Sequence, residues 1–331
     1  MTTPATSSRR RRHWPGTLVA LGAALAVAAL AWGSRPAAIE PIEPLKGRVW
    51  TMWDHSGAMA FVLVGCALAL WIYLRGVRWH RRRGHPVSGW RLASYVSGIA
   101  LTYLILESPF DALSDHIFWI HRVQHVALHH WIPMLLALAA PIPELVAGLP
   151  AWARRHLLLP ILRNRSVRGT WDFIQHPVVA PILFVGLIYF WLTPPIFDYA
   201  TVNETVHEIM HFSMLLEGIP FWWLMLDPKP GRVSYGKRMI ILWAVMVPQM
   251  LIGAYITFSY STLYPIYATL DKGWVGSYLF DQHMGGLVVW IPASMMSAIA
   301  AFFVLVFWTR WARGTGGWPE PTIWEAASEV A

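Results

Sequence analysis

The chain has 331 residues, of which 56% are hydrophobic and 13% charged, and it carries 21 tryptophans. A soluble domain does not bury that much apolar side chain, so the composition excludes an ordinary water-soluble protein and indicates a polytopic membrane protein. The formal net charge of +8 comes from short basic loops beside apolar stretches. The expected partner of these loops is therefore a lipid bilayer with anionic headgroups, and not nucleic acid.

Eight apolar stretches are candidates for membrane-spanning helices. Crossing about 30 Å of hydrocarbon takes about 20 residues of helix, and the stretches approach or reach that length. In chain order they lie near residues 17–33, 57–74, 92–106, 117–140, 178–193, 205–226, 238–258 and 285–308. The first also fits a cleavable signal peptide, because an arginine-rich start precedes a short apolar run. We therefore predict an all-α, polytopic transmembrane helical bundle with seven or eight membrane-spanning helices.

The distribution of basic residues predicts how these helices are oriented. Lys and Arg are retained on the cytoplasmic side of a membrane. With the N-terminus inside, 21 of the 26 Lys and Arg residues fall in cytoplasmic segments, and the C-terminus is also cytoplasmic. The expected domains are a basic N-terminus with the first apolar span and an external loop (1–49), a seven-helix membrane domain (50–312) and a cytoplasmic tail (313–331).

Histidines gather at the outer starts of the predicted helices that run from outside to inside. A membrane imidazole costs free energy unless it finds a partner, so the group needs an explanation. Helical spacing places His121 and His125 on one face of their helix, and His207 and His211 on one face of another. Counted from the outer ends, His121 matches His207 in depth, and His125 matches His211. If the two helices are neighbours, the four rings meet around one ion.

These four histidines are the predicted metal ligands, on the external side of the membrane. Asp281 and His283, at the start of the last helix, are expected to close or orient the set. Imidazole with thioether and few acids favours copper, particularly the cuprous ion, although zinc stays open. Histidines that only bridge helices are the other interpretation. Further candidate ligands are His55, His129, Met210 and Met214, and candidate orienting groups are Gln124, Glu204 and Gln282.

Cys66 and Arg122 bear on which side chains can act as metal ligands. The only cysteine, Cys66, lies in mid-helix, which excludes an intrachain disulfide and a thiolate pair for metal binding. Arg122, beside the histidines, is expected to snorkel outward or to pair with Asp115, Glu204 or Asp281. Metal ligands must therefore come from imidazoles, thioethers and a few carboxylates.

Three motifs occur in the order and spacing of a known family. They are ESPFDALSDHIFWIHRVQHVALHHWIPMLLALAAP, then HPVVAPILF followed by VHEIMHFSMLLEGIPFWWLML, and finally DQHMGGLVVWIP. On these motifs the chain resembles the cytochrome c oxidase assembly factor CtaG family of bacterial membrane proteins, over about residues 50–310. The resemblance implies a seven-helix bundle of the bacterial inner (plasma) membrane that helps to mature the copper centre of a terminal oxidase. It also implies an oxidase subunit as partner, and no enzymatic turnover.

The chain departs from the family pattern near the predicted ligands. The methionine that often follows the first histidine is Arg122 here, and the frequent DQQ is DQH at 281–283. His129 and His130 are additions to the usual pattern. The four predicted ligands and Asp281 are kept, so we expect the site itself to be preserved. The sequence does not decide which metal it binds or which oxidase subunit receives that metal.

Two other functions share the histidine pattern. Membrane metal oxygenases with histidine boxes carry similar clusters, but those boxes are expected at the cytoplasmic face and with assisting carboxylates. A haem-binding electron-transfer subunit would use one histidine from each of two helices as axial ligands. The preferred prediction is a copper-binding assembly factor for a terminal oxidase, with these two as alternatives.

Overall fold

The chain is described by a computed structural model over residues 57–228, 231–270 and 276–314, and every regular element within these ranges is helical. The elements are α2 (Gly57–Arg82), α3 (Gly89–Glu107), α4 (Pro109–His116), α5 (Phe118–Val126), η2 (Ala127–Trp131), α6 (Ile132–Ala139), α7 (Ile142–Gly148), α8 (Ala151–Ala153), η3 (Arg154–Leu158), α9 (Leu159–Arg163), α10 (Arg165–Ile174), α11 (Val179–Leu192), α12 (Pro194–Val202), α13 (Glu204–Leu226), α14 (Tyr235–Thr257), α15 (Pro265–Thr269) and α16 (Tyr278–Ala312). Here η2 and η3 are π-helical turns.

The seven apolar stretches that fall within the described residues all form helices. Four helices, namely α2, α13, α14 and α16, are each long and apolar enough to cross a membrane. Three further crossings would each join two helices at a bend: α3 with α4 at 51°, α5–α6 with α7 at 73°, and α10 with α11 at 73°. The described residues thus contain four to seven candidate spans. The stretch at 17–33 and the domain boundary at 49/50 lie outside the described residues.

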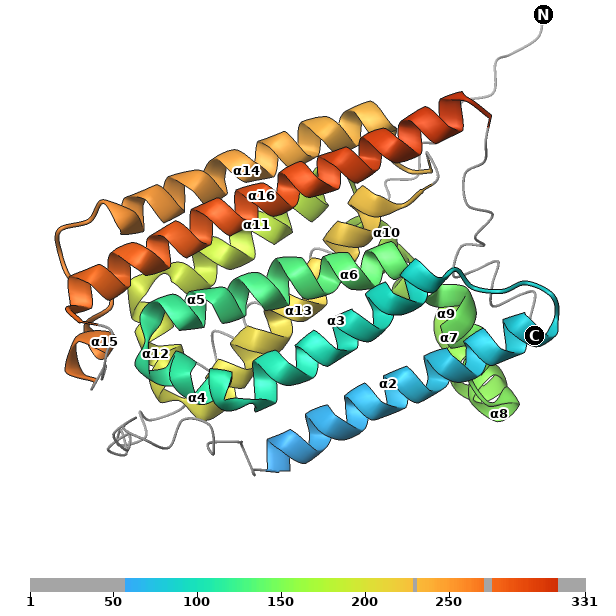
Figure 1. The fold of residues 1–331 in the computed structure, drawn as a ribbon, viewed down its shortest axis with the longest axis horizontal. Helices are drawn as coiled ribbons and strands as arrows, with labels where there is room; N and C mark the ends of the chain where they lie inside the picture. Colours follow the sequence, from blue (N-terminus) through green and yellow to red (C-terminus); the bar gives the residue numbers. More distant parts are fainter. Residues whose placement is uncertain (1–56, 229–230, 271–275, 315–331) are drawn as a thin grey trace, which may run out of the picture.

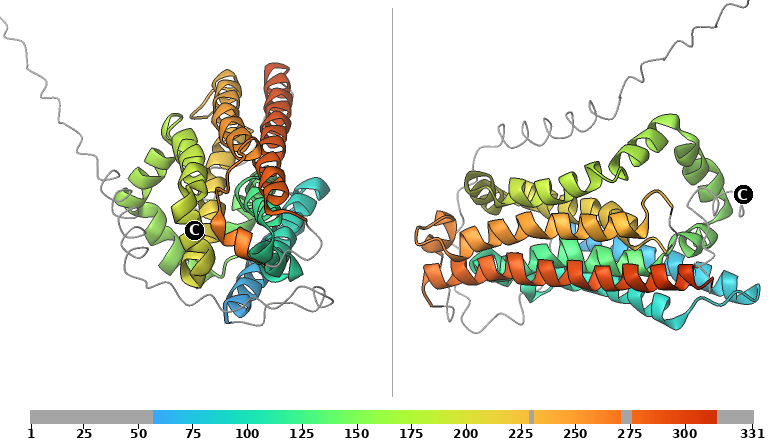
Figure 2. Two further views of the ribbon diagram at one scale, coloured as in Figure 1. Left: turned by 90° about the vertical axis from the view of Figure 1, so that its left-hand side faces the viewer. Right: turned by 90° about the horizontal axis from the view of Figure 1, so that it is seen from above.

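The long helices lie side by side in a bundle (Figure 1). The rod formed by α5, η2 and α6 packs against α13, α3 and α16, which places it in the interior. Two further views put α2 at one margin and α14 with α16 at the other (Figure 2). The short helices α4, α12 and α15 gather where α13 and α16 begin, on the left in Figure 1, and we call this the α15 end. The segment from α7 to α10 occupies the opposite end.

Glycine at position 286 sets the contact between α16 and α14. A Cβ there would lie 2.5 Å from Thr257 N and 2.8 Å from Gly253 O, closer than side-chain atoms approach a backbone. Small residues allow such approach between membrane helices, where dispersion contacts and not the hydrophobic effect hold helices together. The contact fixes α16 at the α15 end, and with it Asp281, which lies about one turn earlier in the same helix.

Candidate metal centre

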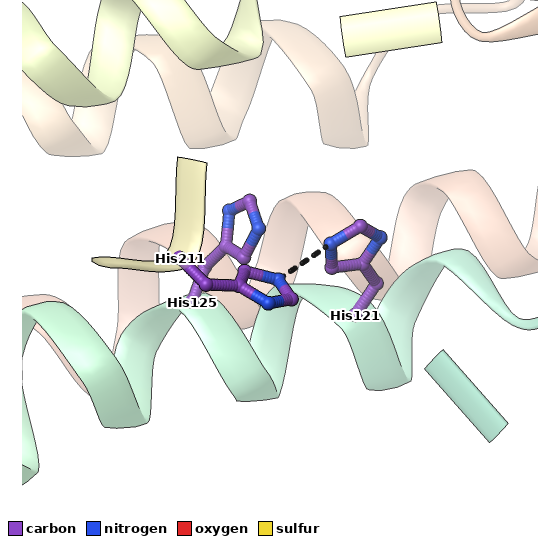
Figure 3. A group of neighbouring side chains, drawn as sticks. All are labelled: His121, His125 and His211. Carbon is purple, nitrogen blue, oxygen red and sulfur yellow. Dashed lines mark hydrogen bonds between the residues drawn. The ribbon is translucent and has the colours of Figure 1, made fainter. Parts of the chain in front are cut away.

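Four imidazoles meet between α5 and α13 near the α15 end. His121 Nε2 lies 3.2 Å from His207 Nε2 and 3.3 Å from His211 Nε2. The ring of His125 has its centroid 4.5 Å from that of His121 and 5.3 Å from that of His211. Figure 3 shows His121 and His125 rising from α5 toward His211 of α13. We call these four residues the histidine cluster, and their convergence is the one expected from the sequence.

The spacing of the nitrogens matches that of metal ligands. Metal–nitrogen bonds of 2.0–2.1 Å in a tetrahedral ion place two ligand nitrogens about 3.3–3.4 Å apart. The two Nε2–Nε2 distances of 3.2 and 3.3 Å agree with this edge. One nitrogen each from His121, His125 and His211 also lies within 4.8 Å of the other two. Small rotations of the rings would therefore bring these nitrogens into one coordination shell.

The tautomer of His121 is fixed from outside the cluster by Tyr267. The phenol of Tyr267 donates to the carbonyl of Ser114 at 2.9 Å, since a carbonyl oxygen only accepts. His121 Nδ1 lies 2.7 Å from the same phenol oxygen and must therefore donate its N–H to it. The neutral ring then presents an unprotonated Nε2 to His207 and His211. A histidine that donates through one nitrogen and presents the other is the usual arrangement of a metal ligand.

Tyr267 was not among the residues predicted for the site. It belongs to α15, a five-residue helix in the loop between α14 and α16, and its ring is fully buried. Gln282 holds this loop in place, because its amide nitrogen donates to Ser261 O at 3.0 Å and its Oε1 accepts from Leu263 N at 2.8 Å. Gln282, a predicted orienting residue, thus contacts the loop that carries Tyr267.

Asp281 caps the helix that carries His121 and His125. Its two carboxylate oxygens accept from the backbone N–H groups of Phe118 at 3.0 Å and Trp119 at 2.9 Å. Those are orphan donors at the start of α5, whose own N-cap residue Ile117 offers no side-chain hydrogen bond. A carboxylate at this position also complements the helix dipole. Asp281 is therefore placed to position α5, and with it the first histidine of the cluster.

For His283, Gln124 and Glu204, no hydrogen bond to the histidine cluster is seen among the described residues. His283 bonds Ser259 O at 2.9 Å, and Glu204 is exposed in the first turn of α13. Gln124 donates to Ile105 O at 3.1 Å and to Asp111 Oδ1 at 2.5 Å. His55 lies outside the described residues.

Both predicted methionines are buried in the interior of α13. Met210 is 0% exposed and Met214 is 2% exposed. Both belong to the apolar cluster that includes Phe118 and Phe197, and Met214 also lines a cavity together with His125. A thioether is therefore available beside the histidine cluster at Met214.

A π-helical turn carries the two additional histidines inward. Pro133 has no N–H, so the carbonyl of His129 loses its usual helical donor. The indole of Trp222 donates to that carbonyl at 3.0 Å, and Ile132 N–H reaches back to Ala127 O. The widened turn buries both His129 and His130, with 1% and 2% of their surface exposed.

His129 and His130 are engaged with each other and with neighbouring helices. Their Nδ1 atoms lie 3.1 Å apart. His129 Nε2 lies 2.9 Å from Glu217 Oε2, and His130 Nε2 lies 2.9 Å from Gln249 Oε1. His129 is thus not brought into the histidine cluster, although it lines the cavity beside His125.

His207 is the member of the histidine cluster closest to the surface. Its side chain is 15% exposed, whereas His121 is 0% and His125 and His211 are each 6% exposed. On its outer side, His207 Nδ1 lies 3.9 Å from Asp115 Oδ1, and the Asp115 side chain is 44% exposed. An ion arriving at the α15 end would meet a carboxylate first and the imidazoles next.

The expectation that Arg122 snorkels outward or pairs with an acid is wrong. Its surface is 1% exposed, and it forms no salt bridge with the described carboxylates. The guanidinium carbon instead lies 4.9 Å from the ring centroid of Phe118 and 4.2 Å from that of Phe197. Asp281, one of the expected partners, accepts from two backbone amides of α5. The faces of these two aromatic rings stabilise the buried guanidinium. The spacing of residues along one helix could not predict this contact.

Comparisons with known proteins agree with the motifs. The model of a family described as cytochrome c oxidase caa3 assembly factor (Caa3_CtaG) matches residues 71–311. Uncharacterized proteins of Mycobacterium bovis and Mycobacterium tuberculosis are each 30% identical over 283 residues, and one of Mycobacterium leprae is 29% identical over 282 residues. Each alignment covers 82% of this chain and 41% of the relative, so the chain spans about two fifths of the length of these curated relatives. No solved structure matches the chain.

The matched residues include every helix that builds the site: α5 and α13 with the four imidazoles, α15 with Tyr267, and α16 with the capping Asp281. Because the family model covers well over half of the chain, the protein belongs to the caa3-type cytochrome c oxidase assembly factor family, CtaG.

Proposed function

We propose that the histidine cluster captures a copper ion as cargo and passes it to a cytochrome c oxidase subunit during assembly of its copper centre. The observation that carries the proposal is the meeting of His121, His207 and His211 through their Nε2 atoms at 3.2 and 3.3 Å. His121 Nε2 is unprotonated, and once His207 and His211 present unprotonated Nε2 atoms as well, the three lone pairs can hold one cation. Because the family assists the assembly of cytochrome c oxidase, the expected recipient of the ion is an oxidase subunit. Such a role requires no catalytic turnover.

The donor set favours cuprous copper over other metals. The cluster offers neutral imidazoles, with the thioether of Met214 beside His125, and hard carboxylate ligands are absent from the three-histidine group. The buried guanidinium of Arg122 repels an added cation, and it repels a divalent ion twice as strongly as a monovalent one. Both arguments favour Cu(I) over Zn²⁺.

Delivery would proceed by ligand exchange at the α15 end. His207, the most exposed member, would accept the ion from outside and release it to a thiolate or imidazole of the client. The opposite end carries Arg154, Arg155, Arg163, Arg165 and Arg168 in η3 to α10. Basic residues stay on the cytoplasmic side, so this end would face the cytoplasm and the histidine cluster would face the outside of the plasma membrane.

Metal analysis of the purified full chain tests the proposal. We expect about one copper per chain by mass spectrometry after growth with copper, little visible colour, and retention of that copper against a zinc excess. An absorption spectrum distinguishes the alternatives, because haem would give a Soret band. A chain that takes up zinc but not copper, or neither, contradicts the proposal.

Replacing Tyr267 by Phe is expected to weaken copper binding by about 10- to 100-fold without removing a ligand. The change deletes the acceptor that fixes the His121 tautomer, and loss of a group that orients a ligand costs about that factor in metal affinity. Competition with a cuprous chelator measures it. Tyr255→Phe, at an exposed tyrosine of α14, is the matched control and should bind as the wild type does. Equal affinities in the two variants would remove Tyr267 from the site.

A further inference from the structure

Arg122 is a buried cation for which the described residues offer no hydrogen-bond acceptor. Within the described residues, its Nε, Nη1 and Nη2 atoms all lack an acceptor. The faces of Phe118 and Phe197 attract the charge, but they cannot accept the five N–H groups of a guanidinium. A charge held in this way inside a membrane protein is strongly unfavourable unless an anion or acceptor reaches it. Arg122 therefore needs a hydrogen-bonding partner that the described part of the chain does not supply.

A cavity lies at the position where such a partner would sit. It has a volume of about 30 Å³ and is lined by Arg122, His125, His129, His130, Met214 and Gln249, among others. That volume is enough for about two water molecules or one monatomic ion. Two further lining groups carry unpartnered nitrogens, namely Nε2 of Gln249 and both ring nitrogens of His125. Gln249 is 1% exposed and His125 is 6% exposed, so bulk water does not reach them freely.

The charge of the lining decides which ion fits. The imidazoles and the thioether of Met214 would also suit a second cation, but no carboxylate is among the described residues lining the cavity. A guanidinium stays protonated in proteins, so every cation placed beside it is repelled. The amide N–H groups of Gln249 and the guanidinium N–H groups, by contrast, are donors suited to an anion.

We propose that this cavity binds a small monovalent anion of the halide class, with chloride as the physiological form. Arg122 supplies the charge and the amide of Gln249 supplies a second donor. The anion neutralises the arginine and thereby removes the penalty of burying it. This part of the proposal does not depend on the metal.

The anion site would also couple to metal binding, and this second part rests on the proposed function. A histidine that gives one nitrogen to a metal keeps an N–H on the other, and the metal makes that N–H a stronger donor. His125 belongs to the three-histidine group and also lines the cavity. An anion there would accept from His125 and offset the combined charge of the metal and Arg122, so each ion should favour the other.

Halide titration of the metal-free protein tests the site. The purified full chain is stripped with a cuprous chelator, and its thermal unfolding is followed in sodium bromide or chloride against sodium methanesulfonate at equal ionic strength. We expect the halides to raise Tm by about 2–4 °C relative to methanesulfonate, because a ligand that binds only the folded state stabilises it. If Tm does not respond to halide, the cavity holds only water and the proposal is overturned.

Substitutions of residues that line the cavity test whether the halide-dependent shift in Tm arises there. Arg122→Met and Gln249→Leu should each lose at least half of the halide shift, whereas Arg310→Met, at an exposed residue near the end of α16, should keep it. Arg122→Lys serves if Arg122→Met does not fold, and it should weaken the response by removing the planar fork of donors. A shift that survives unchanged in the Arg122 and Gln249 variants belongs to another site and overturns the proposal.

Copper affinity measured in the same two salts separates the two proposals. We expect the ratio of wild-type to Arg122→Met affinity to be larger in chloride than in methanesulfonate; an equal ratio would refute the coupling. Comparison with the variant cancels the binding of chloride to copper in solution. A halide shift without copper binding in either salt would sustain the anion site and refute the copper function.

Discussion

Replacing His121 by Asn is expected to reduce copper affinity by more than about 100-fold, the largest effect of any single side chain. His121 Nε2 lies 3.2 Å from His207 Nε2 and 3.3 Å from His211 Nε2, so it is the nitrogen that contacts both of these histidines. An orienting group alone is worth about 10- to 100-fold in metal affinity, and a ligand should be worth more. The asparagine amide can still donate to Tyr267 from the Nδ1 position, so the change removes the ligand atom with the least disturbance of its surroundings.

The measurement is copper per chain and competition with a cuprous chelator, followed by oxidase activity in host membranes that depend on the protein. His283→Gln is the matched control, because glutamine keeps a donor at the Nε2 position for Ser259 O. The control should retain copper and support normal oxidase activity. If His121→Asn retains full copper as well, the histidines bridge helices and do not bind metal. If copper is lost but oxidase activity is normal, the cluster does not supply the oxidase.

The helices and the pairing of the histidines were predictable because both are local properties of the sequence. Apolar length determines where a chain can form membrane helices, and i, i+4 spacing puts His121 with His125, and His207 with His211, on common faces. Matching the depth of the two pairs needed only the rise per residue. The ring distances of 4.9 Å for His121–His207 and 5.3 Å for His125–His211 agree with that reasoning.

The groups that orient the cluster were not predictable in the same way. Tyr267 comes from a short helix 146 residues away from His121, and nothing in its local sequence signals its role. Asp281 was expected to close or orient the set, but the two backbone amides that it meets lie 162 and 163 residues away and could not be named from the sequence. Arg122 was expected to snorkel outward or to pair with an acid, because these are the usual ways to accommodate an arginine in a membrane helix. Its aromatic neighbour Phe197 comes from α12.

Replacing Gly218 by Ala is expected to disrupt the site from a distance. A Cβ on Gly218 would lie 2.7 Å from His129 O and 2.8 Å from Pro133 Cγ, so α13 can pack on η2 and α6 only without a side chain there. The backbone carbonyl cannot turn aside as a flexible side chain can. To lengthen these distances to an ordinary van der Waals contact, α13 must move by several tenths of an ångström. The added methyl should also cost about 1–3 kcal/mol in the free energy of unfolding, the usual range for overpacking.

That movement should reach the histidine cluster because His211 lies on the same helix, two turns before Gly218. A metal site tolerates displacements of about 0.5 Å before its geometry fails. We therefore expect Gly218→Ala to lower copper affinity by at least about tenfold while every ligand and orienting group is retained. Gly186→Ala in α11 is the matched control, because a Cβ there meets nothing within 4 Å. The control should bind copper normally and be as stable as the wild type or slightly more so, since alanine is the better helix former.

Thermal unfolding and chelator competition on the two variants separate stability from binding. Loss of copper in Gly218→Ala at temperatures well below its Tm would mean that the spacing of α13 and η2 sets the distance between the imidazoles. Wild-type affinity in a destabilised Gly218→Ala protein would mean that His121 and His125 follow α13 as it moves. The close packing at Gly218 would then serve folding alone, and the cluster would have to be held by Tyr267, Asp281 and the metal itself.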